Sequence, residues 1–105
     1  MSDPSEVQTF LCGFFEHDAE VVQPQIGAAR FGSRGFKVDG KVFAMESSGA
    51  LALKLPAARA SALADQGKCT ALTMGRRRMK EWVVVNDRAI WPALALEARE
   101  FVRAI

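Results

Sequence analysis

The Asp39-Gly40 dipeptide constrains the fold of this chain more than any other feature, because it separates two stretches that alternate in polarity. Both central positions of a two-residue hairpin turn need a positive φ, and Asp-Gly is one of the pairs that adopt it most readily. Residues 36–38 and 41–46 are therefore predicted to be paired antiparallel strands. Residues 50–55 alternate in the same way after a turn at Ser47-Ser48-Gly49, which predicts another strand.

A helix is predicted before this hairpin. Asp3 is a suitable N-cap, Pro4 suits the first helical position, and Glu6 completes a capping box. The apolar residues that follow recur with the spacing of one helical face: Val7, Phe10, Leu11, Phe14 and Phe15.

The second half of the chain repeats these two patterns. Pro56 opens an alanine-rich helix for which Gly67 is the expected C′ residue. Residues 69–74 and 81–85 read as strands joined by a turn at residues 75–78. A last helix is predicted from about Pro92 to the end, with an apolar stripe of Leu94, Ala98, Phe101, Val102 and Ile105.

The predicted order is helix, two or three strands, helix, two strands, helix. Residues 26–31 are the candidate for the optional strand. Hairpins rather than helical crossovers join the strands, so we expect an α+β fold with a single, mainly antiparallel sheet of about five strands and three helices on one face. A chain of 105 residues is the length of one domain, which we assign to residues 1–105.

Candidates for catalysis or metal binding are few. Cys12 and His17 are five positions apart, which on a helix points them away from each other. Together with Cys69 they fall short of the four ligands of structural zinc. We therefore predict no enzyme, no metal site and no cofactor, and we interpret both cysteines as structural residues of a protein in a reducing compartment. No signal peptide or membrane span is evident, so we expect a cytoplasmic protein without a membrane partner.

The charges are distributed unevenly. Residues 1–26 hold five acids and no Lys or Arg, whereas the other 79 residues hold all 14 bases and seven acids. The bases form two groups, one of Arg76, Arg77, Arg78 and Lys80, and one of Arg30, Arg34, Lys37 and Lys41. Such groups could bind nucleic-acid phosphates. An acidic helix lying across a basic sheet would produce the same asymmetry, and basic residues at a turn can also protect a sheet edge from aggregation.

Several segments carry a family resemblance. Arg30-Phe31-Gly32, residues 35–44 and Leu51-Ala52-Leu53-Lys54-Leu55 resemble the N-terminal domain of TfoX/Sxy-type proteins. Met79-Lys80-Glu81-Trp82-Val83 and Trp91-Pro92-Ala93-Leu94 resemble the related MmcQ/YjbR family. The resemblance implies a bacterial protein with a secretion-chaperone-like α+β fold.

The same resemblance bears on function. TfoX-type proteins are associated with the regulation of natural competence, and YjbR-type proteins are often described as DNA-binding. The second domain of full-length TfoX has no counterpart in this sequence, so we do not extend the competence role to it. The leading hypothesis is a non-enzymatic domain that binds a macromolecule, DNA in particular, through the two basic groups. The alternative is a protein-interaction or homodimerisation module without a nucleic-acid role.

Overall fold

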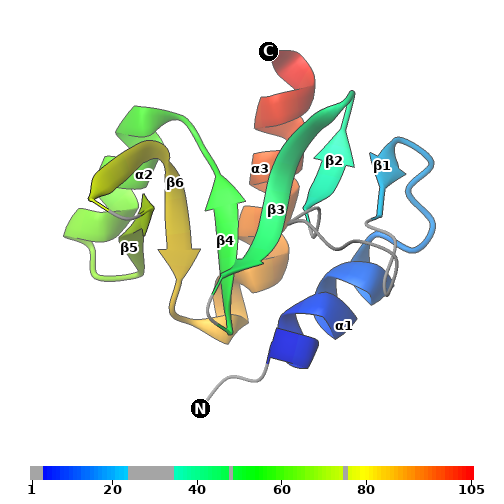
Figure 1. Ribbon diagram of the computed structural model, residues 1–105, viewed down its shortest axis with the longest axis horizontal. Coiled ribbons are helices and arrows are strands. Elements are labelled where there is room, and N and C mark those ends of the chain that lie inside the picture. Colours follow the sequence, from blue (N-terminus) through cyan, green and yellow to red (C-terminus); the bar gives the residue numbers. More distant parts are fainter. Residues whose placement is uncertain (1–3, 24–34, 48, 75) are drawn as a thin grey trace.

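The computed structural model describes residues 4–23, 35–47, 49–74 and 76–105, which form one antiparallel sheet and three α-helices (Figure 1). The sheet has six strands in the order β1-β2-β3-β4-β6-β5. Along the chain the elements are α1 (Pro4–Phe14), β1 (Val21–Val22), β2 (Phe36–Val38), β3 (Lys41–Ser47), β4 (Ala50–Lys54), α2 (Ala57–Asp65), β5 (Cys69–Met74), β6 (Arg77–Val85), the 3₁₀ turn η1 (Arg88–Ile90) and α3 (Trp91–Ala104).

The predicted α+β fold with one antiparallel sheet and three helices is confirmed. Asp39 and Gly40 form the β2–β3 turn with φ values of 54° and 76°, as the dipeptide predicted. The strand β1, only two residues long, was not predicted. The proposed strand at residues 26–31 and the proposed N-cap Asp3 lie outside the described residues.

All three helices pack on the same face of the sheet. Residues alternating along the central strands, such as Leu51, Leu53 and Val83, are buried in one core cluster. The helices contribute to that cluster from α1 (Val7, Leu11), from α2 (Ala60, Leu63) and from α3 (Leu94, Ala95, Ala98, Val102). In Figure 1, α2 lies beside β5 and β6, and α3 crosses β4 and β3. The other face of the sheet carries no helix of the described residues.

A bulge in β3 turns one additional aromatic side chain into the core. Phe36 pairs with Ala44 and Lys37 pairs with Val42, so Phe43 has no partner of its own on β2. An extra residue of this kind interrupts strict alternation. As a result the consecutive residues Phe43 and Ala44 are both fully buried, and the Phe43 ring meets the ring of Phe15 edge-on at 5.2 Å between centroids.

The apolar stripes predicted for the first and last helices are wrong at their C-terminal ends. Phe14 is 37% exposed and Ile105 is 56% exposed, although the periodicity placed both on buried faces. Phe14 is the last residue of α1, and Ile105 follows the last residue of α3, so both lie where the helical face ends. Trp91, at the start of α3, is buried instead, and its indole N–H donates to the Val85 carbonyl at 3.4 Å.

The backbone of Gly35 lies close to the side chain of Val42 on β3. A Cβ at Gly35 would lie 2.6 Å from Cγ1 of Val42, and the β-branched Val42 has little freedom to move away. Gly35→Ala should therefore lower the free energy of unfolding by about 1–3 kcal/mol, as measured by urea denaturation.

Gly13→Ala is the matched control, because a Cβ at Gly13 meets no atom within 4 Å. Replacing a glycine within α1 should stabilise the protein by up to about 1 kcal/mol. Equal effects of the two substitutions would contradict the close approach at Gly35.

Candidate functional site

The arginines of the helical layer are neutralised by acids. Among the described residues, Arg88 of η1 pairs with Glu6 of α1, and Arg59 of α2 pairs with Glu97 of α3 at 2.8 Å. On α3, Arg99 and Arg103 both pair with Glu20. The N-terminal acids Glu6, Asp18 and Glu20 therefore face arginines of η1 and α3, while α1 itself packs on the sheet through its apolar side chains.

Arg99 is the centre of this network. Its guanidinium lies 2.7 Å from an Asp18 carboxylate oxygen and 2.9 Å from Glu20, and it also pairs with Glu100. The side chain is only 13% exposed. The hydrogen bond to Arg99 holds the pKa of the Asp18 carboxyl below its usual value, and the same bond raises the pKa of Arg99. This pairing ties the segment after α1 to α3.

The bases of the sheet are in a different situation. Lys37, Lys54, Arg76, Arg77 and Lys80 form no ion pair within the part of the chain that the structure describes. Because the helical arginines already pair with Glu6, Asp18 and Glu20, most of the bases without an acidic partner among the described residues lie on the sheet and the β5–β6 hairpin, and Lys68 in the turn after α2 is another.

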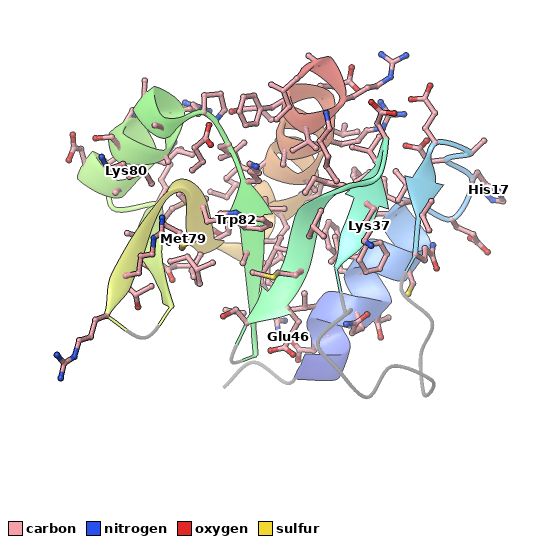
Figure 2. All side chains as sticks on the ribbon, turned by 45° about the horizontal axis from the view of Figure 1, so that its top comes forward. His17, Lys37, Glu46, Met79, Lys80 and Trp82 are labelled. Atoms are coloured by element: carbon pink, nitrogen blue, oxygen red, sulfur yellow. The ribbon has the colours of Figure 1, made fainter. Side chains whose placement is uncertain are left out.

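The first basic group lies at and near the free end of the β5–β6 hairpin. Arg76 and Arg77 are exposed there. The predicted turn at residues 75–78 is too long, because Arg77 and Arg78 already belong to β6 and pair with Met74 and Thr73. Lys80 is exposed farther along β6, on the side of the sheet where α2 lies (Figure 2).

The second basic group is divided between the two faces of the sheet. Lys37 alternates with the buried Phe36 and Val38, so it lies on the face without helices. Lys41 pairs with Val38 and donates from Nζ to the backbone oxygen of Ile105 at the end of α3, so it lies on the helical side. Arg30 and Arg34 lie outside the described residues.

The described members of the two groups do not meet in one patch. The strands β3 and β4 separate β2 from β6, and Figure 2 shows Lys37 and Lys80 towards opposite edges of the sheet. Lys54, which was not among the predicted site residues, lies between them on β4. Its alternation with the buried Leu53 and Leu55 was the sequence signal that could have identified it.

The face without helices is apolar between these bases. Register places Met45, Ala52 and Val84 side by side on it, since Ala52 pairs with both of the others. Met45 and Val84 are half-buried, and Ala52 is fully buried but lies outside the main core cluster. We call this surface the open face, defined by Lys37, Met45, Ala52, Lys54 and Val84. The alternation along β4 was predicted from the sequence, but the surface that it forms with β3 and β6 was not.

The residues considered for catalysis lie apart. The His17 side chain is 94% exposed and lies near Glu16 at the edge of the molecule (Figure 2). Both cysteines are free, and burial raises the pKa of the Cys69 thiol, which disfavours its reactive thiolate form. Within the described residues no three His, Cys, Asp or Glu side chains are grouped to hold a metal ion.

None of the described helices has the length and apolar character that crossing a membrane requires. Comparison with known proteins adds no relative: no protein family, no curated protein and no solved structure matches this chain.

Proposed function

We propose that this chain is a non-enzymatic binding module for the phosphate backbone of DNA, with the β5–β6 hairpin as its main contact. The observation that carries the proposal is the unequal neutralisation of charge. The helical arginines are paired with acids, while Arg76 and Arg77 at the free end of the hairpin are exposed and have no acidic partner among the described residues.

The exposed end of the β5–β6 hairpin is better suited to contact the phosphate backbone of DNA than to recognise its bases. A hairpin end can approach phosphates that a broad sheet face cannot reach, and arginine offers the planar donor fork that phosphate prefers. Phosphate contacts carry little sequence information. Lys80 continues the positive charge from the hairpin end on the side where α2 lies, whereas Lys54 lies on the open face. Lys37, Lys41, Arg30 and Arg34 remain part of the proposal as further contacts away from the hairpin. Binding should therefore be weak, nearly independent of sequence and steeply dependent on salt.

A relation to the TfoX/Sxy and MmcQ/YjbR families belongs to the same proposal. What supports it is the order of elements together with the Asp39-Gly40 turn, which the resembling segments share with this fold. A bacterial, cytoplasmic role close to DNA follows from that relation.

A protein-interaction or homodimerisation module is the second candidate, and the open face favours it. Met45 and Val84 are partly exposed on this face beside the fully buried Ala52, and no described helix covers them. Partly exposed apolar side chains on an uncovered sheet face can mark a protein contact. Sedimentation velocity of the purified protein separates the two candidates, because a stable dimer without DNA affinity would support the second one.

The test of DNA binding is a salt titration of the variant Arg76→Gln/Arg77→Gln. Each phosphate contact contributes about 0.9 to the slope of log affinity against log salt. Loss of both arginines should therefore flatten the slope by about 1.8 units and weaken binding to a duplex of random sequence, as measured by fluorescence anisotropy.

Lys68→Gln is the control, because it removes an exposed base away from the hairpin end that likewise has no acidic partner among the described residues. It should leave the slope nearly unchanged. Equal slopes for the hairpin variant and this control would move the contact away from the hairpin, towards Lys37 and its neighbours. Absence of binding by the wild type at about 50 mM salt, where phosphate contacts are strong, would refute the DNA proposal.

A further inference from the structure

A cavity of about 260 Å³ lies between α2 and the inner part of the β5–β6 hairpin. The helix contributes the small residues Ala57, Ala60, Ser61 and Ala64, and β6 contributes Lys80 and Trp82 among others. The site is distinct from the hairpin end, since neither Arg76 nor Arg77 lines it.

The cavity has a structural cause in β6. Ala71 of β5 pairs with Val83, but its neighbour Leu72 pairs with Met79, so Lys80, Glu81 and Trp82 have no partners on β5. The Glu81 carbonyl instead accepts from the Leu55 backbone N–H at 2.8 Å, which holds this bulge against the end of β4. Opposite the bulge, α2 presents alanines, whose side chains are too short to fill the space.

The two ends of the cavity differ in character. Ala60 and Val83, which are buried, form its inner end, and Ala64 and Ala71 are half-buried. Ser61 and Lys80 are exposed and form the mouth. Among the described residues that line the cavity there is no acid, and Lys80 forms no ion pair with any of the described residues. A ligand with an apolar body and one negative charge matches this arrangement.

We propose that this cavity binds a small aromatic monocarboxylate, with its ring against the alanines of α2 and its carboxylate at Lys80 and Ser61. The size fits this class, because an apolar cavity of roughly 150 Å³ can hold a benzene ring, and drug-sized ligands occupy about 300–1,000 Å³. A ring with a short acidic side chain lies between these limits. The proposal does not depend on DNA binding.

Phenylacetate is the probe, and phenylacetamide, which has the same shape without the charge, is its matched comparison. Titration into ¹⁵N-labelled wild-type protein should shift the amide signals of Ala60, Ala64, Ala71 and Lys80 saturably, with a dissociation constant on the order of 1 mM for so small a ligand. Phenylacetamide should bind about threefold to tenfold more weakly, because it lacks the charge-assisted contact.

Two variants test the two halves of the site. Lys80→Gln should bring the affinity for phenylacetate down to that for phenylacetamide, and Ala64→Leu should abolish binding of both by filling the cavity. Arg76→Gln/Arg77→Gln should bind phenylacetate like the wild type, so failure of the DNA proposal and failure of this one are distinguishable. If Ala64→Leu does not fold, Ala64→Val serves in its place.

Three results would overturn the proposal. The first is an absence of saturable shifts in the wild type up to about 20 mM phenylacetate, which is twentyfold above the expected dissociation constant. The second is equal affinity for phenylacetate and phenylacetamide. The third is unchanged binding of phenylacetate by a folded cavity-filling variant.

Discussion

Phe43→Ala is expected to lower the free energy of unfolding by about 3–5 kcal/mol, the range for truncating a large buried aromatic side chain. Phe43 is fully buried although it breaks the alternation of β3, and its ring packs against Phe15 of α1. Its removal leaves a cavity where the sheet bulge, α1 and the core meet. Urea denaturation followed by circular dichroism measures the loss.

Phe14→Ala is the matched control for this prediction. Phe14 is 37% exposed and stacks on Phe10 at 5.2 Å, so its loss should cost only about 1 kcal/mol. If both substitutions destabilised the protein equally, the β3 bulge would not direct Phe43 into the core.

Arg99→Ala should destabilise the protein by about 2 kcal/mol at neutral pH. Hydrogen bonds to charged groups contribute about 1.5–3 kcal/mol each, and Arg99 is mostly buried between Asp18 and Glu20. Without the guanidinium, three carboxylates are left close together, and Arg103 is the one base among the described residues that still pairs with any of them. Arg59→Ala is the matched control and should cost less than about 1 kcal/mol, because the Arg59 and Glu97 side chains are 43% and 38% exposed, far more than Arg99.

The effect of Arg99→Ala should depend on pH with a definite sign. Arg99 lowers the pKa of Asp18 in the folded protein, so the pairing stabilises the fold in full above the unfolded pKa of about 3.9. That stabilisation is lost as the pH falls below this value and through the lowered pKa of the folded state. The difference between wild type and Arg99→Ala should therefore shrink between about pH 4 and about pH 2. A difference that stayed constant across this range would show that Arg99 acts through packing alone.

Local sequence patterns determined most of the secondary structure. The Asp39-Gly40 turn depends only on the φ preferences of two adjacent residues, and the strands and helices around it follow from the spacing of apolar side chains. Gly67 likewise adopts the positive φ of 75° that ends α2. Such features are determined within a few residues, so no knowledge of distant contacts was needed.

The basic residues of the candidate site were visible in the sequence, but their partners were not. Arg99 has the neighbouring acid Glu100, but its other two acidic partners, Asp18 and Glu20, are distant in the sequence, whereas Arg77 is exposed with no acidic partner among the described residues. The pairing of Asp18 with Arg99 joins positions 81 residues apart. Which charges remain available to a ligand was therefore decided by the packing of the segment after α1 against α3.

The sequence by itself determined the α+β fold class, the central hairpin and the exposure of the bases near the β5–β6 turn. Only the tertiary structure decided the placement of β4 beside β6, the bulges at Phe43 and at Lys80–Trp82, the open face and the cavity under α2. The physical reason is the range of the interactions involved. Turn preferences and side-chain periodicity act between neighbours in the chain, whereas strand order, bulges and cavities arise when elements distant in sequence must share one core.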